Sequence, residues 1–140
     1  MERGAAPSSD KERLPLLLLE DDPRLAELVR HVLAESAPEF DVQHVGRLSA
    51  ALARLVRQPF SLILTDLSLP DSDGPATVRH LQRAAPGVPL VVLSGNGDLG
   101  VAMECTREGA NEFLVKGTAA FQDLGRLLRL ALERRHRTMR

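Results

Sequence analysis

Residues 14–22 read LPLLLLEDD, a short and uninterrupted apolar run that ends abruptly in three acids. A continuous apolar run of this length is typical of a strand buried on both faces of a parallel sheet. Asp22 and Pro23 then form a helix start, and apolar residues recur at helical spacing from Leu25 to Leu33. The stretch therefore predicts a strand, an acidic turn and a helix, which is the opening unit of an α/β fold.

The same unit of strand and helix recurs four more times. Apolar or alternating runs predict strands over 40–45, 60–65, 90–94 and 112–115, and helical spacing predicts helices over 48–56, 75–85, 98–108 and 119–137. Five strands and five helices in alternation predict a five-stranded parallel sheet, doubly wound and in the order 2-1-3-4-5. In such sheets ligands bind at the carboxyl ends of the strands, so the residues there are the first functional candidates.

Composition indicates one soluble domain. The 140 residues are 44% hydrophobic, and 18 Lys and Arg against 19 Asp and Glu leave a net charge of -1. This balance argues against direct nucleic-acid binding, which needs a basic excess. The chain has one cysteine, Cys105, no signal peptide and no apolar run of the roughly 18 residues that a membrane span needs. We therefore expect a cytoplasmic protein without a membrane partner.

Polar residues stand at the carboxyl ends of four predicted strands. Glu20 and Asp21 follow the first strand, Asp66 the third, Ser94 ends the fourth and Lys116 follows the fifth. Two carboxylates about 4 Å apart repel by roughly 4 kcal/mol at an effective dielectric of about 20, so three acids at one point require a cation. Oxygen ligands with open coordination positions favour Mg²⁺, with Mn²⁺ as the alternative ion.

Asp66 is the best candidate for a nucleophile in this group. It ends the central strand, and an aspartate can form an acyl phosphate. A bound Mg²⁺ would neutralise some of the phosphoryl oxygens, and the Ser94 hydroxyl and the Lys116 ammonium would bind the others. Because only two of the 18 basic residues are lysines, a lysine at a strand end indicates that a compact ammonium is needed there.

Four segments together resemble the signature of bacterial response-regulator receiver domains, in the same order and spacing. The segments are LLLLEDD (16–22), LILTDLSLPDSDG (62–74), VVLSGN (91–96) and GANEFLVKG (109–117). The resemblance implies a flavodoxin-like fold and a role in the phosphorelays of two-component systems. It makes the chain a regulatory phosphoacceptor that assists its own phosphotransfer and dephosphorylation, and not an enzyme.

The resemblance also implies the site residues. Asp66 is the phosphoacceptor, which takes its phosphoryl group from a sensor histidine kinase or a phosphotransfer protein. Glu20, Asp21, Asp66 and the backbone carbonyl of Ser68 bind the metal ion, and Lys116 binds the phosphate.

A conformational switch is implied as well. Ser94 is the switch hydroxyl, and Phe113 is the aromatic that rotates when Ser94 moves. Their movement changes the face formed by the fourth helix, the fifth strand and the fifth helix, where a homodimer or a downstream effector would bind. Two residues depart from the family pattern. Gly117 stands where the family usually has Pro, and Phe113 stands where it often has Tyr.

The resemblance suggests three divisions of the chain. We expect residues 1–13 to be a disordered tail, because they carry Gly, Pro, Ser and charge without periodicity. Residues 14–135 form the receiver domain. Residues 136–140 are a basic C-terminal extension, which either complements the dipole of the last helix or begins a connector to an output domain.

Other interpretations remain. A constitutive pseudo-receiver would use the same fold to bind a protein without phosphorylation. A phosphatase with an Asp nucleophile would need an acid at position 68, where Ser stands, and a flavin protein would need aromatics that a chain without Trp or Tyr lacks. The segment GNGDLG (95–100) matches a dinucleotide-binding GxGxxG, but no acid follows at the required distance, and a loop that moves with Ser94 explains the glycines more simply. Asp71 and Asp73 are predicted to be turn or cap residues.

Overall fold

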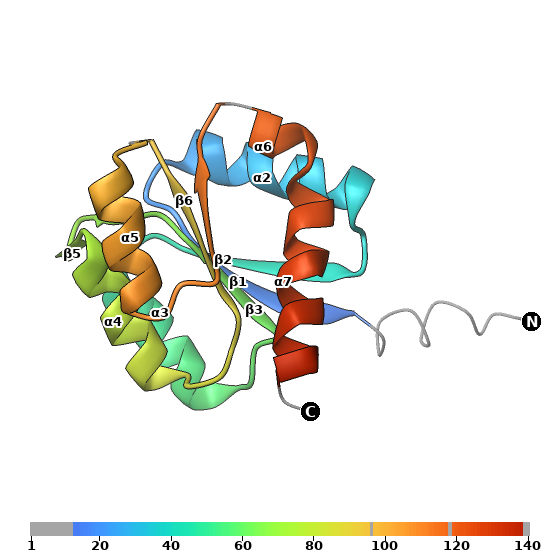
Figure 1. Ribbon diagram of the computed structural model, residues 1–140. Helices are drawn as coiled ribbons and strands as arrows, with labels where there is room; N and C mark the ends of the chain where they lie inside the picture. The colour runs from blue at the N-terminus through green and yellow to red at the C-terminus, as the bar shows by residue number, and fades with distance from the viewer. Residues whose placement is uncertain (1–12, 96, 118, 139–140) are drawn as a thin grey trace, which may run out of the picture.

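The computed structural model describes residues 13–95, 97–117 and 119–138, and it places a five-stranded parallel sheet at the centre of the molecule (Figure 1). The strands are β1 (Leu14–Leu19), β2 (Phe40–Val45), β3 (Leu62–Thr65), β6 (Leu90–Ser94) and β7 (Glu112–Val115). Their spatial order is β2-β1-β3-β6-β7, and every neighbouring pair is parallel. This is the predicted order 2-1-3-4-5.

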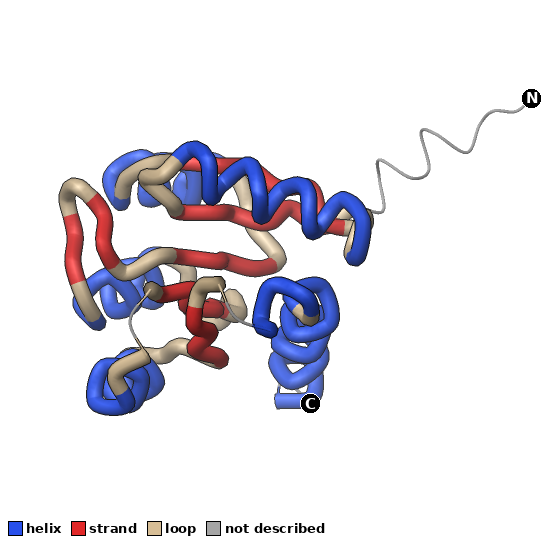
Figure 2. Tube along the Cα trace, turned by 90° about the horizontal axis from the view of Figure 1, so that it is seen from above, coloured by secondary structure: helices blue, strands red, loops and turns tan. Residues whose placement is uncertain are grey.

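Helices cover both faces of the sheet, as a doubly wound fold requires (Figure 2). On one face lie α2 (Pro23–Ser36), α6 (Ala119–Gln122) and α7 (Leu124–Thr138). On the other lie α3 (Leu48–Arg57), α4 (Pro75–Ala84) and α5 (Leu99–Arg107). None of the helices in the described part of the chain is long and apolar enough to cross a membrane.

Strand β1 contributes to both hydrophobic cores. Leu16 and Leu18 pack in the core beneath α2 and α7, and Leu17 and Leu19 pack in the core beneath α3 and α4. All four leucines are buried. Because a fully buried leucine stabilises a fold by roughly 1.5–3 kcal/mol, this run anchors both layers at once.

Two acids cap helices, Asp22 at the predicted helix start and Asp98 just before a helix that was predicted to include it. Asp22 accepts a hydrogen bond of 2.9 Å from the backbone N–H of Arg24 at the start of α2. Asp98 accepts one of 2.7 Å from Gly100 at the start of α5. Each carboxylate satisfies a backbone donor that the first turn of a helix leaves open.

The structure refines the prediction in three places. Strand β3 begins at Leu62 instead of residue 60, since its ladder with β1 starts where Leu62 pairs with Leu16. The loop after β3 contains a small hairpin of β4 (Ser68–Leu69) and β5 (Ser72–Asp73) that the sequence did not predict.

The predicted last helix consists of α6 and α7, interrupted at Asp123. The helical hydrogen bonds nevertheless continue across the interruption, because Asp123 N–H donates to Ala119 and Leu127 N–H donates to Asp123. The predicted tail, except for Arg13, and residues 139–140 of the predicted extension lie outside the described residues. Residues 136–138 continue α7.

Candidate functional site

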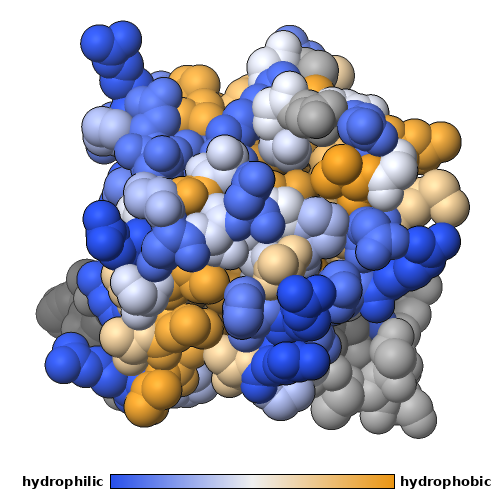
Figure 3. Space-filling view, turned by 90° about the vertical axis from the view of Figure 1, so that its left-hand side faces the viewer, coloured by the Kyte–Doolittle hydropathy of each residue, from blue (hydrophilic) through white to orange (hydrophobic). Residues whose placement is uncertain are grey.

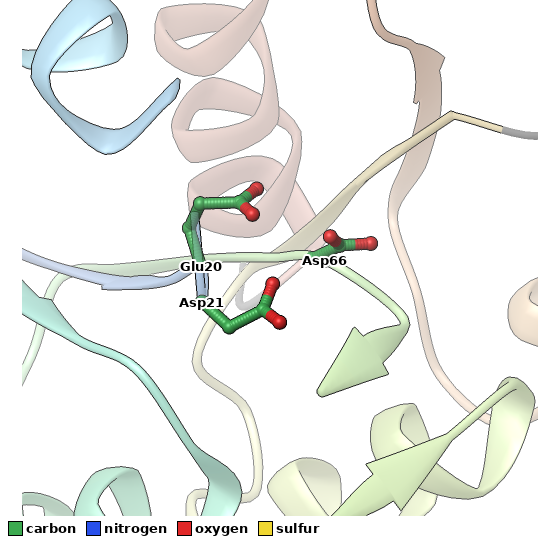
Figure 4. A group of neighbouring side chains, drawn as sticks. All are labelled: Glu20, Asp21 and Asp66. Atoms are coloured by element: carbon green, nitrogen blue, oxygen red, sulfur yellow. The ribbon is translucent and has the colours of Figure 1, made fainter. Parts of the chain in front are cut away.

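Three carboxylates meet at the carboxyl ends of the neighbouring strands β1 and β3. One oxygen each of Glu20, Asp21 and Asp66 lies within 4.8 Å of the others. Figure 4 shows the three side chains around a common space, with Glu20 and Asp21 following β1 and Asp66 following β3. Glu20 is 2% exposed and Asp66 is 7% exposed, whereas Asp21 is open to solvent. The sheet topology therefore assembles the acids that the sequence singled out.

Lys116 bridges two of these acids. Its Nζ lies 2.7 Å from Oδ2 of Asp66 and 3.0 Å from Oε1 of Glu20. The other oxygen of Asp66, Oδ1, accepts hydrogen bonds of 2.6 Å from the N–H of Leu67 and 3.2 Å from the N–H of Ser68. Asp66 thus has an ammonium on one oxygen and backbone donors on the other.

Burial and hydrogen bonding have opposite effects on the pKa values of Glu20 and Lys116. Burial raises the pKa of Glu20, and this effect outweighs the hydrogen bonds from the N–H of Asp22 and from Lys116 that lower the same pKa. Burial alone would lower the pKa of Lys116, but its hydrogen bonds to Asp66 and Glu20 together raise that pKa. Lys116 is therefore a firmly protonated ammonium at neutral pH.

The donor set fits a hard divalent cation. Three carboxylates face one ammonium, so two negative charges remain to be balanced, and a divalent ion supplies that charge. The acids offer oxygen ligands only, which suits Mg²⁺ or Mn²⁺ better than a soft metal. Because Asp21 is exposed, an ion held by these acids would remain accessible to solvent and to a second ligand.

A pocket of about 460 Å³ opens beside the acids. Its polar lining comes from Asp66, Ser68, Asp73, Ser94 and Lys116. Ser94 ends β6 and is buried, and it reaches the same pocket as Asp66 and Lys116. The pocket therefore collects a carboxylate, a hydroxyl and an ammonium in a space large enough for a phosphoryl group.

Phe113 lies in β7, the strand that pairs with β6. It is half-buried, packs against the core beneath α3, α4 and α5, and stands opposite Val92 of β6 in the ladder. It stands two residues before Val115, the residue of β7 that pairs with Ser94. The predicted switch pair thus lies on adjacent strands.

Gly117, directly after Lys116, has a left-handed backbone conformation. Its φ is +73°, in the left-handed region that favours glycine, and the described residues contain no cis peptide bond. A Cβ at this position would meet nothing within 4 Å, so the backbone angle alone calls for glycine. Proline, whose φ is restricted to about −65°, could not adopt this angle.

The structure adds two residues that the sequence did not place near the site. Asp71 accepts hydrogen bonds from the N–H groups of Leu48 and Ser49 at the start of α3. His44 Nε2 lies 2.6 Å from the backbone carbonyl of Glu20. The role of Asp71 had one signal in the sequence. Arg47, just before α3, is a poor helix cap, which indicates that another residue supplies the cap.

Comparisons with known proteins agree with this arrangement. The family model of the response regulator receiver domain matches residues 16–128. The response regulator protein PilR of Pseudomonas aeruginosa is 33% identical over 118 residues, which are 84% of this chain and 25% of PilR. The chain thus spans about a quarter of the length of this curated relative.

Solved structures share the fold. The signal receiver domain of a putative Luxo repressor protein from Vibrio parahaemolyticus is 27% identical, with a TM-score of 0.78 over 89% of this chain and 93% of the other. The Mn²⁺-bound form of response regulator Rcp1 is 26% identical, with a TM-score of 0.72 over 86% of this chain and 95% of the other.

The matched region contains all five sheet strands except the first two residues of β1, and it contains the acids, Ser94 and Lys116. Receiver domains bind a divalent metal at this acidic pocket, and the residues here fit such an ion. The resemblance predicted from the four sequence segments is confirmed. The chain belongs to the response regulator receiver domain family.

Proposed function

We propose that this receiver domain is a phosphorylation switch with Asp66 as the phosphoacceptor. One observation carries the proposal: Asp66 is buried at the floor of an open pocket, within reach of two further acids and hydrogen-bonded to Lys116. The phosphoryl donor is a sensor histidine kinase or a phosphotransfer protein. Glu20, Asp21, Asp66 and the backbone carbonyl of Ser68 would hold the divalent ion, for which we propose Mg²⁺, with Mn²⁺ as an alternative.

The transfer is a displacement at phosphorus. A carboxylate oxygen of Asp66 forms the new P–O bond, and the P–N bond of the donor's phosphohistidine breaks. The imidazole leaves with the electron pair and takes up a proton from solvent. A divalent ion held by Glu20, Asp21 and Asp66 would supply positive charge to the phosphoryl oxygens. Lys116, which already lies 2.7 Å from Oδ2 of Asp66, provides the cationic partner for another of these oxygens.

The new group adds about 1.5 to 2 negative charges to the site. In our proposal Ser94 moves toward a phosphoryl oxygen, the loop after Gly95 follows, and Phe113 turns into the vacated space. Driving such a switch from 1:99 to 99:1 needs about 5.5 kcal/mol of differential stabilisation. New charge-assisted hydrogen bonds from Ser94 and Lys116 are its source.

The face that would respond is made of α5, β7 and α7. It carries apolar side chains in solvent, since Leu99 is 73% exposed and Met103 is 50% exposed on α5. Figure 3 views the molecule from the side of α4 and α5 and shows hydrophobic groups between the polar side chains. Exposed apolar side chains on a switching face suit a homodimer or a downstream effector as the partner.

The experiment that tests this function uses beryllofluoride, a stable mimic of the phosphoryl group. We expect bound fluorine signals in the NMR spectrum only when Mg²⁺ is present, and we expect Asp66→Asn to abolish them. Absence of bound signals at saturating Mg²⁺, together with tight binding of a partner, would favour the constitutive pseudo-receiver instead. Signals that persist in Asp66→Asn would reject Asp66 as the acceptor.

A further inference from the structure

Asp71 joins two parts of the molecule that are distant in sequence. It stands at the tip of the β4–β5 hairpin, where Oδ1 accepts a hydrogen bond of 2.8 Å from Leu48 N–H and Oδ2 accepts one of 2.9 Å from Ser49 N–H. Both donors belong to the first turn of α3. Arg47, the residue at the N-cap position of that helix, makes no side-chain cap hydrogen bond. The hairpin therefore supplies the cap of α3 from outside the helix.

The hairpin itself is short. Its ladder has two pairs, Ser68 with Asp73 and Leu69 with Ser72. Two-stranded ribbons are marginally stable in water even when they are longer, so a hairpin of this size depends on contacts with the rest of the fold. Leu69, in the pair next to the turn, is buried in the core, and the two hydrogen bonds of Asp71 hold the tip.

The hairpin begins at the acceptor site. The N–H of Ser68 donates to Oδ1 of Asp66, and the carbonyl of Ser68 is the proposed backbone ligand of the metal ion. A displacement of the hairpin would therefore disturb a hydrogen bond to the acceptor carboxylate and a ligand of the ion together.

We propose that Asp71 is a positioning residue for the metal site. By fastening the hairpin to the start of α3, it keeps Ser68 where the ion needs it. The inference rests on the proposed function, since it assumes that the pocket binds a divalent ion. Linkage makes the coupling reciprocal: if Asp71 favours Mg²⁺ binding, then Mg²⁺ binding strengthens the contact between the hairpin and α3.

A simpler role for Asp71 is that of a helix cap alone, and the structure offers a way to separate the two. Arg47 has φ −154° and ψ 160°, the extended backbone that N-cap residues adopt. The substitution Arg47→Ser would give α3 a cap of its own. In Asp71→Ala combined with Arg47→Ser, the helix is capped again but the hairpin is no longer fastened to it.

The test is a calorimetric Mg²⁺ titration, with thermal midpoints measured alongside. We expect Asp71→Ala to weaken Mg²⁺ binding by about 10- to 100-fold, the usual effect of losing a partner that orients a metal ligand. In the double variant the midpoint should recover while the affinity stays weak. Asp98→Ala, which removes an acidic cap from α5, is the matched control and should lose stability without losing affinity. Titration at high salt screens the long-range electrostatic effect that the loss of one negative charge has on Mg²⁺ affinity.

Two outcomes would overturn the inference: wild-type affinity in Asp71→Ala, or affinity that recovers in the double variant together with stability. A wild-type protein that binds no Mg²⁺ would contradict the proposed function itself, and this role of Asp71 with it. Hydrogen exchange gives a readout without any variant. The amides of Leu48 and Ser49 should exchange more slowly when Mg²⁺ is added, and unchanged exchange would contradict the coupling.

Discussion

The Nζ of Lys116 donates a hydrogen bond of 2.7 Å to Oδ2 of Asp66, which joins the end of the edge strand β7 to the end of the central strand β3. The two residues are 50 positions apart in the chain. Their contact places the cation of the site directly on the proposed acceptor. It also ties the strand that carries Phe113 to the residue whose phosphorylation Phe113 would report.

Removing the Lys116 ammonium should destabilise the metal-free protein. In Lys116→Met, Asp66 and Glu20 lose their shared cation, and removing one partner of a buried ion pair costs about 3–5 kcal/mol. We expect a lower urea midpoint by circular dichroism in Mg²⁺-free buffer and a partial recovery when Mg²⁺ is added. Lys116→Arg is the control, because it keeps the charge. A midpoint equal to that of the wild type would show that the bridge adds nothing to stability.

The positive φ of Gly117 predicts how substitutions at this position change the stability of the protein. Gly117→Ala should cost about 1–2 kcal/mol, the penalty of the left-handed conformation for a residue with a Cβ. Gly117→Asn should cost less, since asparagine tolerates that conformation better. Chemical denaturation of the three proteins checks this order. Equal stability of the alanine and glycine forms would mean that the turn relaxes to a different backbone.

The ion pair between Glu39 and Arg129 predicts a pH-dependent contribution to stability. Its side-chain hydrogen bonds from Arg129 lower the pKa of Glu39. A depressed carboxyl pKa adds stability above the ordinary value of 4.5, and that stability is lost as the pH falls through the lower pKa in the folded state. Because the pair is partly exposed, we expect Glu39→Gln to cost only about 0.2–1 kcal/mol at pH 7.

This difference between Glu39→Gln and the wild type should shrink as the pH falls below 4.5, and denaturation curves across that range would measure it. A difference that stays constant with pH would attribute the loss to packing and not to the charge of Glu39.

Loss of the Ser94 hydroxyl should separate phosphorylation from its structural response. In Ser94→Ala the beryllofluoride adduct should still form, because Asp66 and the acids are intact. The amide NMR signals of β7 around Phe113 should then stop shifting when the adduct forms. Thr106→Ala, which removes an exposed hydroxyl from α5 that bonds only its own helix backbone among the described contacts, should respond like the wild type. Full shifts at Phe113 in Ser94→Ala would refute the relay.

The strand ends could be predicted from sequence because parallel strands buried on both faces appear as plain apolar runs. The leucines of β1 and the acids that follow them are the clearest case. Once five such runs alternate with helices, topology brings Glu20, Asp66 and Lys116 to one edge of the sheet without any knowledge of distances.

Contacts that depend on exact backbone paths could not be predicted in this way. Glu20 and Asp21 are sequence neighbours, yet one is buried and the other exposed. The sequence predicted that Asp71 is a turn or cap residue, but only the folded hairpin shows that it caps α3. The left-handed turn at Gly117 likewise depends on the loop that follows β7.

The phosphoacceptor role of Asp66 is tested most directly by the intact mass of the protein after incubation with acetyl phosphate, with and without Mg²⁺. We predict a single phosphoryl adduct that needs Mg²⁺, is absent in Asp66→Asn, and is unchanged in Asp41→Asn, which makes the same chemical change on β2, outside the pocket. An adduct that persists in Asp66→Asn, or that forms equally well without a divalent ion, would show that Asp66 is not a metal-assisted phosphoacceptor.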